Sequence, residues 1–189
     1  MNAYVNLENV RLETKRLILR AFQKTDVNDF YEYAKVEGVG EAAGWSHHQD
    51  VDESKRILEL FMKEKKTFAV VYKDNQKVIG SIGLEEVREL DESFDLLRGR
   101  EIGYVLNKDY WGQGLMSEAV QGVMRYCFEG LQVDFLTCGY FIENIRSKRV
   151  NEKMGFDYYK DYIHHTRFHE TRDAHMTLMT KEKYFSSKN

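Results

Sequence analysis

The alternation of hydrophobic and polar residues in the range 11–22 predicts a first strand, with Leu17 and Leu19 on one face. A helix is expected next, because Thr25 or Asp26 can accept hydrogen bonds from the free amides of its first turn. The hydrophobic residues of this helix recur at helical spacing and are Val27, Phe30, Tyr31 and Ala34.

The range 37–50 contains three glycines and is expected to form a loop. A second helix follows, and Asp50 or Asp52 can cap it. The apolar face of this helix consists of Ile57, Leu58, Phe61 and Met62. Two strands are predicted at 67–72 and 78–87, joined as a hairpin by an Asp-Asn turn.

The middle of the chain is predicted to continue with strands and helices in alternation. A charged loop at 90–99 leads to a central strand at 100–106, and the following helix begins at Ser117. One face of that helix carries Ala119, Val120, Val123, Met124, Cys127 and Phe128. The next strand is expected at 133–141.

The last part of the chain is predicted to contain one short helix and two further strands. Asn144 can cap the helix, and Gly155 can end it by adopting the left-handed conformation that other residues resist. The strands are expected at 157–166 and 173–180, and the chain from Tyr184 onward is expected to be frayed.

Composition changes this picture little. The 189 residues, 42% hydrophobic and 31% charged, are typical of one globular domain spanning 1–189, with a core at about 12–180. The formal net charge of -3 favours neither nucleic acid nor an anionic membrane as a partner. No apolar run approaches the ~18 residues that span a bilayer. Residues 1–8 show no signal-peptide pattern, so we expect a cytoplasmic protein, monomeric or homodimeric.

The stretch EIGYVLNKDYWGQGLMSEA, residues 101–119, connects the central strand to the next helix through a turn with two glycines. The first amides of a helix have no acceptor inside it, and the helix dipole adds partial positive charge there. Such a corner suits a phosphate group. The chain lacks Gly-x-Gly-x-x-Gly and Gly-Lys-Ser/Thr, which argues against a dinucleotide-binding fold and a P-loop.

Two further segments accompany this corner, NIRS at 144–147 and EKMGF at 152–156. Together, these residues resemble the GNAT acetyltransferase family, which binds acetyl-CoA. Within that family, the turn YWGQG at 110–114 and the opening TKRLILR at 14–20 are similar to the branch of ribosomal-protein N-terminal acetyltransferases (RimJ/RimL type). The resemblance extends over about residues 12–180.

The resemblance implies an α/β fold with a central, mostly antiparallel twisted sheet flanked by helices. It also implies acetyl-CoA as co-substrate, without a metal. The amides of the corner would face the pyrophosphate of CoA, and the central strand, which splays from its neighbour, would pair with the pantetheine arm. The implied cofactor-binding residues are Tyr104, Val105, Leu106, Trp111, Gly112, Gln113, Gly114, Leu115, Met116, Ser117 and Asn144. Met116 stands where the family pattern has Gly or Ala.

Acetyl transfer needs a neutral amine, whereas the pKa is ~8 for an α-amino group and ~10.4 for a lysine side chain. A carboxylate can take the proton directly or through a water. Glu101, at the start of the central strand, is the first candidate for this base. A solvated glutamate at a strand end is the equal alternative, and Glu85 and Glu86 are weaker candidates.

The leaving thiolate can require a proton donor. Many family members have a Tyr directly before the Glu-Lys-x-Gly-Phe segment, where this chain has Asn151. The branch resemblance suggests Ser147 as the substitute, although an ordinary place in the first helical turn explains it too. A thiol of pKa ~8.5 can also leave with the help of water. Asn144 is implied to contact the pantetheine or the thioester, although helix capping alone explains an Asn there.

The histidines and cysteines do not predict a metal site. Along a strand, His165 and His169 would share one face while His164 would face away, and no cysteine pair lies nearby. Cys127 and Cys138 are expected to be buried thiols, because neither shows an activating neighbour for a covalent acetyl-cysteine route.

The predicted function is therefore transfer of the acetyl group of acetyl-CoA to a primary amine by direct attack in a ternary complex. The acceptor can be a protein N-terminus, a lysine or a small amine, because the fold does not set it. In the family, Trp45, His47, His48 and the loop at 91–99 border the acceptor; alternatively, they only pack on the sheet. An alternative function, suggested by the missing tyrosine, is a catalytically inactive CoA-binding sensor or structural protein.

Overall fold

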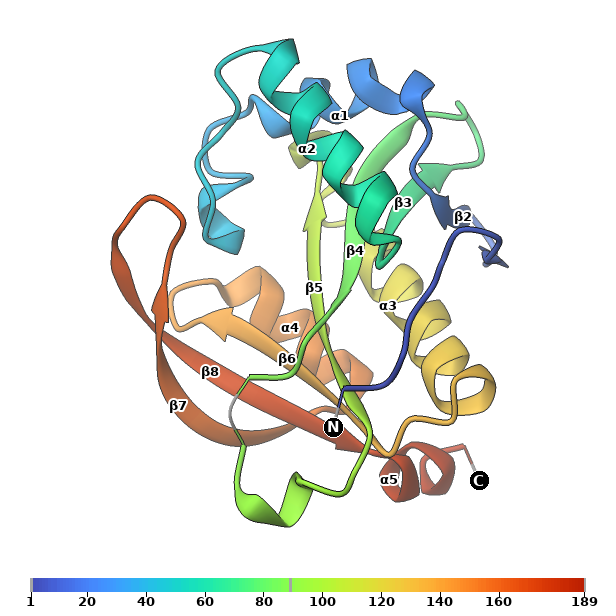
Figure 1. Cartoon of the computed structure of the whole chain (residues 1–189), viewed down its shortest axis with the longest axis vertical. Coiled ribbons are helices and arrows are strands. Elements are labelled where there is room, and N and C mark those ends of the chain that lie inside the picture. Colours follow the sequence, from blue (N-terminus) through green and yellow to red (C-terminus); the bar gives the residue numbers. More distant parts are fainter. Residues whose placement is uncertain (1, 89, 189) are drawn as a thin grey trace.

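The computed structural model describes residues 2–88 and 90–188, and these form an eight-stranded sheet of order β1-β2-β3-β4-β5-β6-β8-β7 (Figure 1). Neighbouring strands are antiparallel, except that β5 and β6 are parallel. The strands are β1 (Arg11–Glu13), β2 (Leu17–Ala21), β3 (Thr67–Tyr72), β4 (Val78–Glu85), β5 (Gly99–Leu106), β6 (Phe135–Phe141), β7 (Asp157–His165) and β8 (Thr171–Thr180). The predicted mixed, mostly antiparallel sheet is confirmed.

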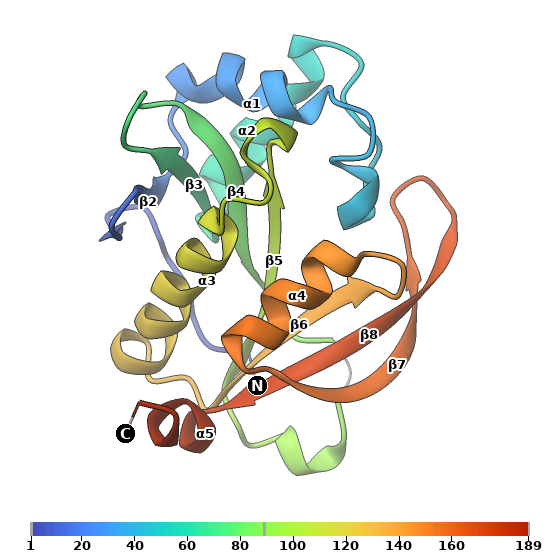
Figure 2. The ribbon, with the colours of Figure 1, turned by 180° about the vertical axis from the view of Figure 1, so that it is seen from behind.

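Helices cover both faces of this sheet. Figure 1 shows α2 in front of β3 and β4, and Figure 2 shows α3 and α4 in front of the opposite face. The helices are α1 (Val27–Ala34), α2 (Val51–Glu64), α3 (Leu115–Arg125), α4 (Ile145–Met154) and α5 (Lys181–Ser186). Helix α3 continues into a π-helical turn at Tyr126–Gly130. Within 2–88 and 90–188, no helix combines the length and apolar character needed to cross a membrane.

Alternating residues of the strands supply two separate cores. Leu17 and Leu19 of β2 pack with α3, whereas Ile18 between them packs with α1 and α2. Successive side chains of a strand point to opposite faces, so one apolar strand can serve both cores. Burying each such side chain contributes ~1.5–3 kcal/mol, which fixes the strand register because a shift by one residue would exchange the faces.

The single strand predicted at 11–22 is wrong. A turn at residues 14–16 divides it into the antiparallel pair β1 and β2. Thr14 Oγ1 accepts a hydrogen bond from the amide of Leu17 at 3.0 Å, and the Thr14 amide donates to the Leu17 carbonyl at 3.0 Å. Such local bonds let threonine compete with extended pairing, and alternation of polarity does not reveal them.

The remaining predicted elements occur with small shifts of their ends. Asp50 caps α2 by accepting from the Glu53 amide at 2.7 Å, and Gly155 ends α4 with a φ of 77°. Helix α3 begins at Leu115 rather than at Ser117, so the free amides start two residues earlier.

Two predictions about helix ends are wrong. Asp26 does not cap α1, because its carboxylate binds the guanidinium of Arg20 at 2.7 and 2.8 Å. The chain from Tyr184 is not frayed, since Tyr184 lies in α5 and stacks on Phe128 with the ring centroids 4.5 Å apart. Asn189 lies outside the described residues.

Candidate active site

Strands β5 and β6 separate in the middle of the sheet. They pair only between residues 99–102 of β5 and 135–138 of β6. Beyond this point β5 stays paired with β4 as far as Leu106, and β6 stays paired with β8 as far as Phe141, so the facing edges diverge (Figure 1). This confirms that the central strand splays from its neighbour. An unpaired strand edge offers backbone N–H and C=O groups to an extended ligand.

The opening between these strands leads into a cleft of about 470 Å³. The cleft runs from the glycine turn before α3 to the C-terminal ends of β6 and β7. The predicted site residues that line it are Glu101, Tyr104, Val105, Leu106, Trp111, Gly112, Gly114, Leu115, Met116, Ser117, Asn144 and Ser147. Gln113 does not line it; its side-chain amide donates to the Asp109 carbonyl at 3.2 Å.

The glycine turn has the geometry of an anion cradle. Gly112 and Gly114 have φ values of +75° and +73°, a conformation that residues with side chains rarely adopt. A Cβ built on Gly112 would meet nothing within 4 Å, so the space beside it is open. In the described chain, the amides of residues 112–117 donate to no protein acceptor. They are therefore available to a ligand at the N-terminus of α3.

Cationic side chains surround this cradle. Arg16 Nη2 and Lys153 Nζ each lie 3.9 Å from the position a Cβ would take on Gly114. The guanidinium of Arg146 lies 3.9 Å from the ring centroid of Trp111, and Arg146, Arg149 and Lys153 line the cleft. Charge-assisted hydrogen bonds from such groups are the strong contacts to phosphate, so the residues present fit a diphosphate.

Sequence reasoning missed the three cationic residues of α4 that line the cleft. The run IRSKRVNEKM holds four cationic residues, but nothing local shows which of them reach the cleft.

The indole of Trp111 donates from Nε1 to the carbonyl of Leu106 at 2.8 Å. That bond ties the turn to the end of β5 and occupies the Leu106 carbonyl. Pairing of a ligand with the strand edge therefore falls mainly to residues 103–105. At Gly103 a Cβ would again meet nothing within 4 Å, which leaves room for a ligand beside the strand.

Glu101 lies at the inner end of the cleft and is only 7% exposed. Arg88 Nε lies 2.9 and 3.0 Å from its two carboxylate oxygens. Burial raises the pKa of Glu101 above its ordinary value, and the positive charge of Arg88 offsets part of this rise. The alternative of a solvated strand-end residue is wrong. Neither Glu85, whose carboxylate pairs with Lys66 at 2.7 Å, nor Glu86 lines the cleft.

Arg88 connects Glu101 to two residues of β7. Its Nη1 donates to Nδ1 of His164 at 2.9 Å, and its guanidinium lies 5.0 Å from the ring centroid of Tyr162. Because an arginine only donates, His164 Nδ1 is an acceptor and its ring is neutral. Burial and the charge of Arg88 accordingly lower the pKa of His164.

Sequence reasoning missed this group, although Tyr162 and His164 are two residues apart on one strand and so share a face. Their partner Arg88 lies in the loop after β4, and no local pattern links it to β7.

Ser147 takes part in a buried hydroxyl pair. Its Oγ lies 2.8 Å from the hydroxyl of Tyr104, and Asn151 Nδ2 donates to the same Tyr104 hydroxyl at 3.3 Å. Burial raises the pKa of Tyr104 well above its ordinary value, so its hydroxyl stays protonated. Asn151 Oδ1 accepts from Thr177 at 2.6 Å. Asn151 thus joins α4 to β8 and is 2% exposed, which leaves it no access to a ligand.

The loop between α1 and α2 covers the end of the cleft opposite the glycine turn. Its residues Val39, Ala42 and Ala43 line the wall of the cleft there. Asn144 holds this loop, because its Nδ2 donates to the Ala42 carbonyl at 3.2 Å. Asn144 Oδ1 meanwhile caps α4 by accepting from the Ser147 amide at 3.1 Å. The predicted capping role of Asn144 is confirmed, and contact with pantetheine stays a prediction.

The aromatic residues expected to border the acceptor pack elsewhere. His47 Nδ1 lies 2.8 Å from Glu41, and His48 Nδ1 lies 2.7 Å from Ser54 Oγ. The rings of Trp45 and His48 contact each other at 5.1 Å. None of these three lines the cleft, and neither do residues 91–99.

The other titratable groups keep structural roles. Within the described residues, no three His, Cys, Asp or Glu side chains are placed to hold a metal ion. His169 lies in the turn after β7, with a φ of 64°, and not on a strand face shared with His165. Cys127 and Cys138 are buried, and burial raises the pKa of each to about 12, which confirms the predicted inert thiols.

Comparison with known proteins agrees with this geometry. A family model described as "Acetyltransferase (GNAT) domain" matches residues 16–157. The chain belongs to the GNAT acetyltransferase family. Probable N-acetyltransferase YjcK of Bacillus subtilis is 33% identical over 158 residues, which cover 79% of this chain and 73% of that protein.

Two further matches agree with the predicted branch and fold. [Ribosomal protein uS5]-alanine N-acetyltransferase of Escherichia coli is 25% identical over 176 residues, covering 84% and 85% of the two chains. The crystal structure of a GCN5-related N-acetyltransferase from Brucella melitensis has a TM-score of 0.80 at 18% identity. It covers 100% of this chain and 86% of that one. The prediction of an N-acetyltransferase, from a family that generally uses acetyl-CoA, is confirmed.

Proposed function

We propose that this enzyme transfers the acetyl group of acetyl-CoA to the α-amino group at the N-terminus of a protein or peptide, with Glu101 as the catalytic base. One observation carries the proposal. A single cleft joins an anion cradle, an unpaired strand edge and a buried carboxylate, in that order. These three features suit the diphosphate, the pantetheine arm and the reacting amine of a ternary complex.

On this proposal the cradle and its cations hold the diphosphate of CoA, and residues 103–105 pair with the pantetheine arm. Trp111, whose ring is covered by Arg146, closes the turn over the ligand. The acetyl thioester then lies where β5 and β6 part, between Glu101 and the hydroxyl pair of Ser147 and Tyr104.

The character of the base favours an α-amine as acceptor. At pH 7 about one tenth of an amine of pKa ~8 is neutral, against fewer than one in ~1,000 for a lysine of pKa ~10.4. Burial raises the pKa of Glu101 and Arg88 offsets part of that rise, so the carboxylate suits an acceptor that is already close to neutral. The uS5-alanine N-acetyltransferase of E. coli, by its name, modifies an alanine of a ribosomal protein. A peptide N-terminus is therefore the acceptor we propose.

The residues of the cleft then account for each proton. Glu101 takes one proton from the ammonium group, directly or through a water, and the amine nitrogen attacks the thioester carbon. The C–N bond forms, the C–S bond breaks, and its electron pair passes to sulfur. Ser147, supported by Tyr104, delivers its proton to the thiolate, and the second proton of the nitrogen passes to Ser147 and restores its hydroxyl. Glu101 finally releases its proton to solvent.

The test is release of free CoA with three acceptors. These are a lysine-free peptide with a free N-terminus, an N-terminally blocked peptide with one lysine, and a polyamine. We expect turnover with the first alone, and kcat about 10²–10⁴-fold lower for Glu101→Gln. Glu86→Gln, at an exposed carboxylate outside the cleft, is the matched control and should match the wild type. Preference for the blocked peptide or the polyamine would contradict the proposed acceptor.

A further inference from the structure

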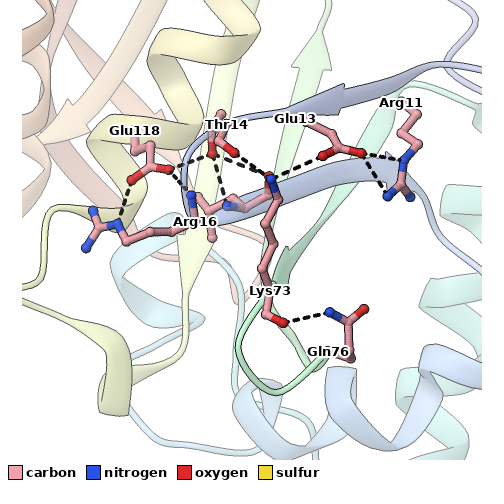
Figure 3. Close-up of polar contacts among 8 residues, drawn as sticks. Arg11, Glu13, Thr14, Arg16, Lys73, Gln76 and Glu118 are labelled. Carbon is pink, nitrogen blue, oxygen red and sulfur yellow. Dashed lines mark hydrogen bonds and ion pairs between the residues drawn. The ribbon is translucent and has the colours of Figure 1, made fainter.

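The turn between β1 and β2 is clamped onto the first turn of α3 (Figure 3). One carboxylate oxygen of Glu118 accepts from Thr14 Oγ1 at 2.6 Å and from the Arg16 amide at 2.7 Å. The other accepts from Arg16 Nε at 2.7 Å. More than one hundred residues separate the two segments in sequence. The segment 14–20 is part of the family resemblance, but none of its residues lines the cleft.

The clamp extends to the anion cradle. Arg16 Nη1 donates to the carbonyl of Gln113 at 3.0 Å, inside the glycine turn. Arg16 Nη2 has no protein acceptor in the described part of the chain and lies 3.9 Å from the position a Cβ would take on Gly114. Two nitrogens of Arg16 therefore hold the turn and α3, and the third lies beside the space that a ligand phosphate would occupy.

The rest of the fold keeps Arg16 in this place. Lys73 Nζ donates to the Thr14 carbonyl at 2.7 Å and the Lys73 amide donates to the Arg16 carbonyl at 2.9 Å, so the turn is held from the side opposite α3 (Figure 3). Gly122 of α3 permits the close approach, because a Cβ there would lie 3.2 Å from Thr14 Cγ2. A side chain held at both ends loses little further freedom when it binds a ligand.

The charge of Arg16 also removes a conflict. Burial opposes ionisation of Glu118, but hydrogen bonds from Thr14 and Arg16 outweigh it and lower the pKa of Glu118 below its ordinary value. Glu118 is thus an anion in the first turn of the helix that would bind another anion. Its pairing with Arg16 cancels that charge, and without Arg16 the carboxylate would repel a phosphate group.

We infer that Arg16 is a binding and positioning residue for the diphosphate of acetyl-CoA. Nη2 binds a phosphate oxygen, while Nε and Nη1 fix Glu118 and the carbonyl of Gln113. The inference rests on the proposed use of acetyl-CoA, and it predicts that Arg16 matters only for donors that carry the diphosphate.

The experiment measures kcat and KM of Arg16→Gln with acetyl-CoA, with its 3′-dephospho form, and with S-acetylpantetheine, which has the same thioester and no phosphate. We expect KM to rise about tenfold or more for the first two donors, with kcat within about twofold. With S-acetylpantetheine, kcat/KM should stay within about twofold of the wild type. Arg16→Lys keeps the charge but lacks the planar guanidinium with its several N–H donors, so it should give an intermediate KM.

Arg11→Gln is the matched control, because Arg11 lies in the same hairpin and, among the described residues, its side chain pairs only with the exposed Glu13. It should behave as wild type with every donor. An equal loss with S-acetylpantetheine would overturn the inference, since Arg16 would then be a structural residue only. A loss confined to the donor with the 3′-phosphate would also overturn it, because the contact would be to that group. Absence of binding and turnover by the wild type would instead refute the proposed use of acetyl-CoA.

Discussion

The two ends of the cleft are built in different ways. The end that suits the CoA diphosphate comes largely from one continuous stretch, residues 103–117, and offers backbone amides and two glycines of positive φ. The opposite end comes from β5, β7 and two loops, and it offers the side chains of Glu101, Arg88, Tyr162 and His164. The backbone amides of one turn need only a local chain path, whereas the ion pair of Glu101 with Arg88 needs segments that meet through the fold.

The two ends also differ in charge. Arg16, Arg146, Arg149 and Lys153 leave the diphosphate end positive, since the Glu118 carboxylate beside them is paired with Arg16. At the acceptor end Glu101 and Arg88 compensate each other and His164 is neutral. This difference predicts that charge changes affect donor binding at the first end and the pH dependence of the reaction at the second.

Gly114→Asp gives the largest expected effect. The added carboxylate would lie in the cradle, and both its strain and its charge would oppose a phosphate. Acetyl-CoA at about 100 times its Kd should stabilise the wild type by roughly 2.7 kcal/mol, a rise in Tm of about 5–11 °C. The variant should show no rise. Gly114→Asn places a neutral side chain of nearly the same size at the same positive φ, so the difference between the two variants isolates the added charge. A normal rise for Gly114→Asp would contradict the assignment of the cradle.

Arg88→Gln tests the acceptor end through pH. Glu101 faces Arg88 as well as Glu85, Cys138 and Tyr162, and of these only Arg88 lowers its pKa. A catalytic base acts when ionised, so activity rises as the pH rises through its pKa. Without Arg88 that pKa rises further, and the acidic limb of kcat/KM should move up by about one pH unit.

The control for this profile is Lys77→Gln, which removes a cation paired with Glu32 outside the cleft. The acidic limb of kcat/KM in this variant should lie at the same pH as in the wild type. The titration of the acceptor amine is common to all the variants, so it cancels in the comparison. If the acidic limb of kcat/KM in Arg88→Gln stays at the wild-type pH or moves to lower pH, Glu101 is not the titrating base.

The smallest expected effect is that of Glu41→Gln, which changes the stability of the loop that covers the acceptor end of the cleft. Burial opposes ionisation of Glu41, but hydrogen bonds from His47 and the Gly38 amide lower its pKa from 4.5 to about 2. The stability this contributes is present above pH 4.5 and is lost as the pH falls towards 2. The variant should lose roughly 1–3 kcal/mol of unfolding free energy at pH 7, and less as the pH falls to 3.

Urea denaturation at several pH values measures this difference. Glu37→Gln, at an exposed carboxylate of the same loop, should leave the unfolding free energy unchanged. A gap between Glu41→Gln and the wild type that stays constant from pH 7 to pH 3 would show that the Glu41 carboxylate is not the cause.

Much of the fold followed from local pattern. The strands β3 and β4, the apolar face of α3 and the cap at Asn144 were all predicted, because each depends on residues close together in the sequence. The glycine turn was predicted for the same reason. Even the buried cysteines follow from helical and strand spacing.

The predictions that failed have a common cause, which is that the residues involved contact partners far away in the sequence. Thr14 ends β1 through bonds to Leu17 and Glu118, and one of these partners is 104 positions away. Glu101 was found by its position on a strand, but its burial and its partner Arg88 were not. His164 was expected to face away from His165, which consecutive places on β7 agree with, but its position in the cleft was not foreseen.

The sequence by itself therefore determined the elements and the glycine turn, since backbone conformation, capping and amphipathic spacing act over a few residues. Only the tertiary structure decided which charges surround that turn and what holds the Glu101 carboxylate. Arg16, Lys153 and Arg88 reach their partners across separate elements. The strength of a charge interaction depends on distance and burial, and both are set by packing between elements that no local pattern specifies.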